Sequence, residues 1–128
     1  MRSRDINSQL RILAAEITPQ STKLQVLAAM VRKYKFLQIC VTARNHGGVE
    51  FTDETCPCCA KYSYEGRGQT GRFGRRECPA YPCMPVVNGL RFADDFKDWE
   101  DTVYARLLFW EKKLQALLKR HPRRRNSK

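Results

Sequence analysis

Residues 56–83 read CPCCAKYSYEGRGQTGRFGRRECPAYPC and contain five of the six cysteines of the chain. Within them, the pairs Cys56-x2-Cys59 and Cys78-x4-Cys83 flank an insert of 18 residues. Prolines inside both clusters stiffen the turns, so each pair can aim its sulfur atoms at one point. Two such turns supply the four thiolates of a tetrahedral zinc site that has no open coordination position. The stretch therefore predicts one structural zinc ion bound by Cys56, Cys59, Cys78 and Cys83.

The cysteines allow other assignments. Disulfides also use paired cysteines, but they need an oxidising compartment, and residues 1–5 are not followed by an apolar signal segment. We therefore expect reduced thiols and a cytoplasmic protein. Cys58 is a spare thiol that can replace Cys56 or Cys59 as a ligand. Cys40 lies in an apolar run and is expected to be a small core residue.

The chain is strongly basic. It carries 24 lysines and arginines against 13 acidic residues, a formal net charge of +11. A small domain with this charge usually meets an acidic partner, most often nucleic acid. The alternative is a charge that only favours solubility. Because residues 119–128 carry six basic residues and no acidic one, the charge is concentrated there and in the cysteine-rich stretch.

Residues 1–35 predict two helices. Each has apolar residues at steps of three and four, which share one face; they are Ile6, Leu10, Leu13 and Ile17, then Leu24, Leu27, Val31 and Tyr34. The pair Thr18-Pro19 should end the first helix and begin the second, with Thr18 as N-cap. Arg32, Lys33 and Lys35 lie beside the second apolar face and are expected in solvent.

Residues 36–55 predict a β-hairpin. The run 36–42 is rich in β-branched residues, the turn signal Asn45-His46-Gly47-Gly48 follows, and residues 49–52 alternate. Ile39, Val41, Val49 and Phe51 would form its buried face. The alternative is that the second helix continues to Ala43. His46 is expected to be a loop histidine without a metal role.

The insert between the thiol pairs combines glycines with arginines and aromatic residues and has no apolar periodicity. Such a loop can follow a phosphate backbone and stack on bases. The alternative is that its charge neutralises the zinc–thiolate centre. After Pro122, the basic tail 122–128 is expected to be disordered. The predicted nucleic-acid contacts are Arg67, Arg72, Arg75, Arg76, Tyr62, Tyr64, Phe73, Arg123, Arg124 and Arg125.

Residues 93–120 predict one long helix. Its apolar stripe recurs at helical spacing: Phe92, Phe96, Trp99, Val103, Leu107, Trp110, Leu114 and Leu117. Acidic residues near the start and basic residues near the end complement the helix dipole. Trp99 and Trp110 are expected to pack in the core against the first two helices. The alternative is that the stripe binds a partner or forms a homodimer.

These segments predict a single domain over residues 1–121. Its fold class is mainly α with a small β element, and a zinc-stapled loop module spans residues 56–83. No apolar run is long enough for a transmembrane helix. The motifs of zinc deaminases, thioredoxin-like oxidoreductases and phosphate-binding loops are absent. We therefore expect a protein that is not an enzyme.

The CPCC segment within Thr55–Ala60 and the later CPAYPC, in a short basic chain with a long C-terminal helix, resemble small cysteine-rich zinc-binding proteins of bacteriophages and prophages. The resemblance implies nucleic-acid regulation, or the blocking of a host factor that includes host defence, in the host cytoplasm. Our expectation is a zinc-stabilised protein that binds DNA or RNA. The alternative is a phage-type inhibitor of a host or defence protein that handles nucleic acid.

Overall fold

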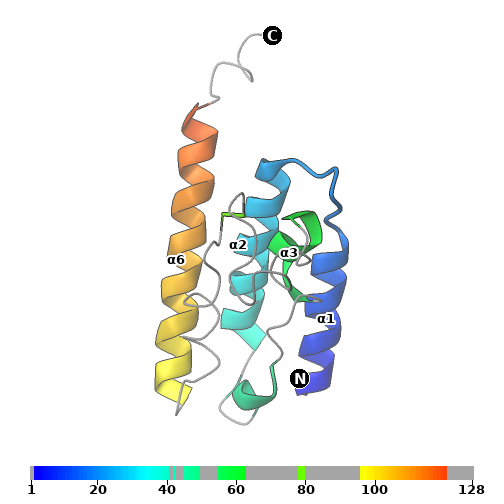
Figure 1. The fold of residues 1–128 in the computed structure, drawn as a ribbon. Coiled ribbons are helices and arrows are strands. Elements are labelled where there is room, and N and C mark those ends of the chain that lie inside the picture. The colour runs from blue at the N-terminus through cyan, green and yellow to red at the C-terminus, as the bar shows by residue number, and fades with distance from the viewer. Residues whose placement is uncertain are drawn as a thin grey trace, which may run out of the picture.

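The computed structural model describes residues 2–40, 42, 45–49, 55–62, 78–79 and 96–120. These residues form the α-helices α1 (Ser3–Ala15), α2 (Lys23–Cys40), α3 (Pro57–Tyr62) and α6 (Phe96–Arg120), and the 3-10 helix η1 (His46–Gly48) (Figure 1). The mainly helical class is confirmed, and no strand occurs within these ranges.

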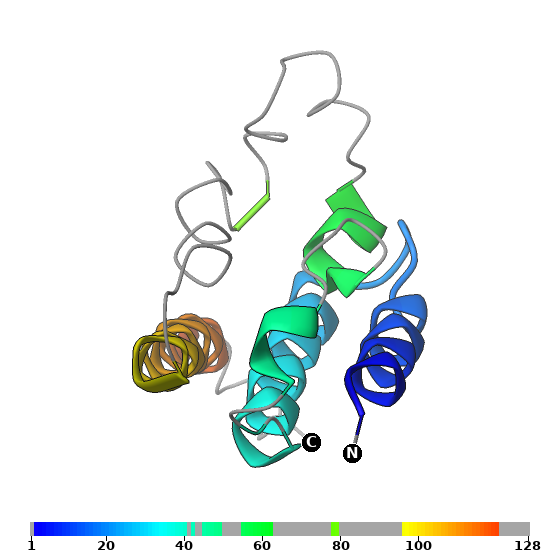
Figure 2. The same cartoon turned by 90° about the horizontal axis from the view of Figure 1, so that it is seen from below.

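Helix α2 is the centre of the fold. It runs antiparallel to α1 on one side and to α6 on the other (Figure 1), and its most extensive contacts are with α6. Viewed from below, the three helices lie side by side in a layer, and α3 lies on one side of that layer (Figure 2). Because α3 packs against both α1 and α2, the first cysteine cluster is fixed to the helical core.

The core fills the space between α1, α2 and α6. Trp99 and Trp110 are 3% and 0% exposed, so their predicted core role is confirmed. The first predicted face is also confirmed at three of its four positions, with Leu13 only half-buried. The other buried apolar residues of the three helices and their connections include Ile6, Leu10, Ile17, Val26, Leu27, Met30, Tyr34, Leu37, Val103 and Leu107.

The predicted start of the second helix is wrong. Helix α2 begins at Lys23, four residues after Pro19. The Thr22 hydroxyl accepts a hydrogen bond from the Gln25 backbone N–H at 3.1 Å, and the Gln25 side-chain carbonyl accepts one from the Thr22 N–H at 2.8 Å. This reciprocal capping box satisfies two backbone donors that a helix otherwise leaves unpaired at its start. The Thr18-Pro19 pair lies instead in the connecting turn, where the Ser21 N–H donates to the Thr18 carbonyl.

The first strand of the predicted hairpin is also wrong, because residues 36–40 continue α2. The competing expectation, a longer second helix, is confirmed as far as Cys40. Leu37 is fully buried on the same helical face as Tyr34, whereas the β-branched Ile39 is 81% exposed. Burial at helical spacing outweighs the weaker β propensity of single residues. The turn expected at residues 45–48 is present as η1, while residues 50–54 lie outside the described part.

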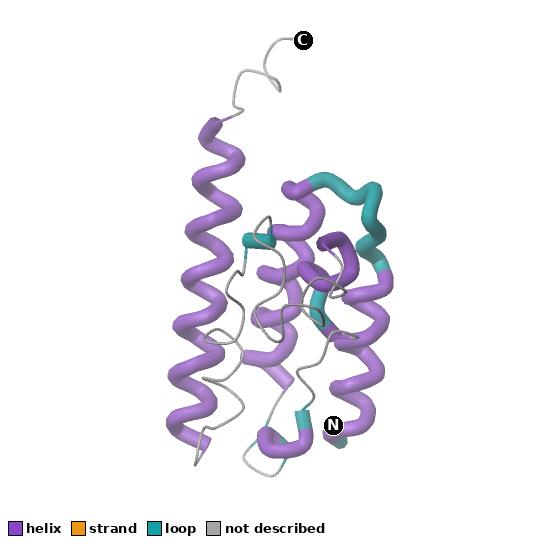
Figure 3. The backbone as a smooth tube through the Cα atoms, viewed as in Figure 1, coloured by secondary structure: helices purple, strands orange, loops and turns teal. Residues whose placement is uncertain are grey.

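Helix α6 ends at Arg120, as predicted, and begins at Phe96. Residues 93–95 and the predicted tail 122–128 lie outside the described ranges. Its last turns extend beyond the start of α2 (Figure 3). Among the described helices, none combines the length and apolar character needed to cross a membrane.

Candidate metal centre

The CPCC sequence forms the start of α3. Pro57 occupies the first helical position, where its fixed φ angle suits a helix and its missing N–H costs no hydrogen bond. The Ala60 N–H donates to the Cys56 carbonyl at 3.1 Å and closes the first turn. Cys56 and Cys59 are three residues apart, so this turn places them on the same side of the helix.

The second cysteine cluster contributes Cys78 to the same place. Thiol hydrogen bonds join Cys56 to Cys58 and Cys59, and a further one joins Cys58 to Cys78. Each described cysteine is a free thiol. Three predicted ligands, Cys56, Cys59 and Cys78, are therefore brought together with Cys58. The fourth predicted ligand, Cys83, lies outside the described residues.

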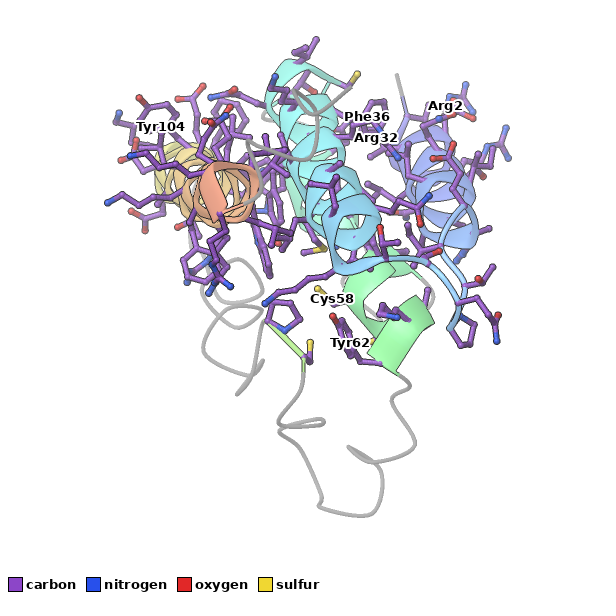
Figure 4. All side chains as sticks on the ribbon, turned by 90° about the horizontal axis from the view of Figure 1, so that it is seen from above. Arg2, Arg32, Phe36, Cys58, Tyr62 and Tyr104 are labelled. Carbon is purple, nitrogen blue, oxygen red and sulfur yellow. The ribbon has the colours of Figure 1, made fainter. Side chains whose placement is uncertain are left out.

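Cys58 is the deepest thiol of this cluster. It is 1% exposed, whereas Cys56, Cys59 and Cys78 are half-buried. Figure 4 shows Cys58 and Tyr62 on the side of α2 that faces α3, away from Arg32 and Phe36. The sequence identifies Cys58 only as a spare, because spacing does not reveal which of three neighbouring cysteines points inward.

Lys33 lies against the cluster, which corrects its expected position in solvent. It is only 3% exposed. Its amine is 5.5 Å from the centroid of the Tyr34 ring, and its charge interacts with Cys56, Cys58 and Cys59. The sequence does contain a signal for its burial, since position 33 continues the helical stripe of buried residues at positions 26, 30 and 37.

These contacts separate the acidities of the thiols. Hydrogen bonds from the thiols of Cys58 and Cys59 hold the pKa of Cys56 well below its usual value, and Lys33 lowers it further. Hydrogen bonds to Cys56 and Cys78, together with burial, raise the pKa of Cys58 well above its usual value. Burial lowers the pKa of Lys33, although the three thiols oppose that shift. Cys56 is therefore the thiol of this pair that most readily becomes the thiolate that a metal requires.

Two tyrosines border the thiols. Burial raises the pKa of Tyr34, with Cys56 adding to the effect, and burial also raises the pKa of Tyr62, with contributions from Cys58 and Cys78. The Lys61 amine donates to the Pro19 carbonyl at 3.1 Å and lies 5.5 Å from the Tyr62 ring centroid. This contact ties α3 to the connection between α1 and α2. Tyr62, a predicted nucleic-acid contact, is thus a half-buried residue of α3.

The remaining site predictions are placed as follows. His46 packs its ring edge-on against Phe96 and Trp99, with ring centroids 5.8 and 6.1 Å apart. The other predicted nucleic-acid contacts lie outside the described residues: Arg67, Arg72, Arg75, Arg76, Tyr64, Phe73, Arg123, Arg124 and Arg125. Within the described part of the chain, no three His, Cys, Asp or Glu side chains form a group arranged to hold a metal ion.

Comparison with known proteins adds no further constraint on the site. No protein-family model, no curated protein and no solved structure matches the chain. The chemistry of the site is therefore argued from the residues of this chain alone.

Proposed function

We propose that this chain is a non-enzymatic nucleic-acid-binding or regulatory protein whose fold is stabilised by one structural zinc ion. The observation that carries the proposal is the meeting of Cys56, Cys58, Cys59 and Cys78, which come from two clusters separated by an 18-residue insert. Free thiols gathered from distant segments are suited to Zn²⁺, which prefers four sulfur or nitrogen ligands. With Cys83 as the fourth ligand, or Cys58 in place of Cys56 or Cys59, no coordination position remains for a substrate.

The nucleic-acid half of the proposal is supported by charge. The chain has a formal net charge of +11, and basic side chains are exposed on all three long helices: Arg2 at the start of α1, then Arg4, Arg11, Lys23, Lys35, Lys112, Lys119 and Arg120. Cations in solvent attract the phosphate backbone by releasing its condensed counterions, which needs no particular base sequence.

A protein-binding inhibitor is the second candidate, and a different observation favours it. Tyr104 and Leu108, one turn apart on α6, are 52% and 47% exposed. Figure 4 shows Tyr104 on the far side of α6 from α1. Exposed aromatic residues often anchor protein interfaces. In this case the partner would be a host or defence protein that handles nucleic acid.

Metal analysis tests the zinc half. We expect about one zinc ion per chain in protein purified under reducing conditions. Cys59→Ser and Cys78→Ser should lose most of the zinc, while Cys40→Ser, which changes a cysteine outside the cluster, should retain it. Wild-type protein without zinc would refute this half.

A salt titration tests the nucleic-acid half. We expect random single-stranded DNA, duplex DNA or RNA oligonucleotides to bind with an affinity that falls steeply as salt increases. If none of them binds at low salt, the nucleic-acid half is wrong. A nuclease-resistant protein partner that loses affinity for Tyr104→Ala would then support the inhibitor.

A further inference from the structure

Helix α2 carries a cation into the core on the side of the cysteine cluster. Lys33 continues the stripe formed by Val26, Met30 and Leu37, and it is 3% exposed. Its neighbour two positions on, Lys35, is exposed. A lysine usually keeps its ammonium group in water even when its methylene stem is covered. The burial of the whole Lys33 side chain therefore requires a compensating interaction.

The groups that interact with the Lys33 charge identify that compensation. Cys56, Cys58 and Cys59 all act on it, and the Tyr34 ring lies 5.5 Å from its amine. Protonated thiols carry no formal charge, so a metal-free cluster offers little to balance an ammonium group. A zinc ion with four thiolates carries a formal charge of about −2, because four negative ligands exceed the charge of the metal.

We propose that Lys33 is the built-in counter-charge of the zinc–thiolate centre, so that it stabilises the metal-bound protein over the metal-free protein. This inference rests on the proposed zinc site and assigns a regulator of its affinity. In the metal-free chain the buried ammonium opposes folding, whereas in the zinc-bound chain it offsets part of the negative charge. Lys33 thereby couples the helical core to occupancy of the cysteine cluster.

Three variants separate this role from a general structural one. Lys33→Met keeps an unbranched apolar stem and removes the charge, Lys33→Arg keeps the charge, and Lys35→Met removes an exposed charge from the same helix. Zinc affinity is measured for each by competition with a chromophoric chelator under reducing conditions. We expect Lys33→Met to bind zinc about 10- to 100-fold more weakly, as for other residues that support metal ligands from outside the coordination shell. Lys33→Arg should recover most of the affinity, and Lys35→Met should match wild type.

A second measurement compares the metal-free proteins. Because Lys33→Met removes a buried charge, its urea midpoint without zinc should equal or exceed that of wild type, while the increase caused by zinc should be smaller. If Lys33→Met does not fold, Lys33→Gln provides the same comparison with a polar tip.

The possible failures can be told apart. Wild type that binds zinc with the same affinity as Lys33→Met would overturn the role of Lys33 and leave the zinc site intact. Loss of equal stability with and without zinc would show that Lys33 is only a packing residue. Wild type that binds no zinc would overturn both proposals.

Discussion

The Asn7 side-chain amide donates a hydrogen bond of 2.9 Å to the Gly48 carbonyl, which joins α1 to η1 across 41 positions of sequence. Asn7 is 7% exposed. The same turn holds the His46 ring against Phe96 and Trp99 of α6. One buried amide therefore connects the first helix to the turn that contacts the last helix.

Removal of this amide should weaken the fold. We expect Asn7→Ala to lower the free energy of unfolding by about 1–2 kcal/mol, because a hydrogen bond is lost and a partly buried carbonyl loses its donor. Urea unfolding monitored by tryptophan fluorescence measures the change. Ser8→Ala, at an exposed position of the same helix, is the control and should leave the midpoint nearly unchanged. Equal midpoints for the two variants would contradict the role of Asn7.

The capping box at the start of α2 gives a second prediction. Thr22→Ala removes the hydroxyl that accepts from the Gln25 N–H, and loss of an N-cap usually costs about 1 kcal/mol. Thr22→Ser retains the acceptor and should stay close to wild type. Chemical denaturation followed by circular dichroism distinguishes them. If serine destabilises as much as alanine, the methyl group and not the cap is important.

The two faces of α6 should respond differently to truncation. Trp110 is fully buried and meets the Phe109 ring edge-on at 4.9 Å. Trp110→Ala should therefore cost roughly 3–5 kcal/mol of unfolding free energy. Leu108→Ala, on the half-exposed outer face, should cost less than about 1 kcal/mol, since surface substitutions usually have small effects. Similar losses for the two variants would show that the outer face is also packed.

Zinc removal should act mainly on the cysteine cluster. Structural zinc contributes on the order of 10 kcal/mol to the folding of sites that it organises. The buried core of α1, α2 and α6 consists largely of apolar residues from those helices. We therefore expect a chelator to expose Cys56, Cys58, Cys59 and Cys78 to a thiol reagent while most of the far-ultraviolet helical signal remains. Unchanged thiol reactivity after verified zinc loss would refute this expectation.

The basic insert and the basic tail should contribute unequally to nucleic-acid binding. Arginine can grip a phosphate with two hydrogen bonds and stack on bases, whereas a short charged tail offers only screened attraction. Replacement of Arg72, Arg75 and Arg76 with alanine should therefore weaken binding more than deletion of residues 122–128.

A charge-matched control completes that experiment. The variant Arg4→Ala, Arg11→Ala and Lys23→Ala also removes three positive charges, all from exposed positions on α1 and α2. Salt titrations of the three variants reveal how many counterions each region releases. If the insert variant binds like wild type, the insert charge only balances the thiolates. If the helix variant loses as much affinity as the insert variant, total charge and not the insert governs binding.

The sequence alone determined the parts of the fold that depend on periodicity. Apolar residues at steps of three and four identified the buried face of α1 and most of that of α6, including Trp99 and Trp110. A helix with one apolar face must bury it, so the pattern suffices without knowledge of the partner helix. The grouping of cysteines likewise predicted which segments meet, because short thiol pairs are useful only when they converge.

Only the tertiary structure decided the features for which local signals compete. Residues 36–40 have β propensity, yet they extend α2 because Leu37 is buried there at helical spacing. Spacing left Cys58 as a spare, and packing made it the deepest thiol. Lys33 has the composition of a surface residue, but its place on the stripe brings it beside the thiols. In each case the free energy of burial against a neighbouring element, which sequence propensity does not contain, determines the position of the side chain.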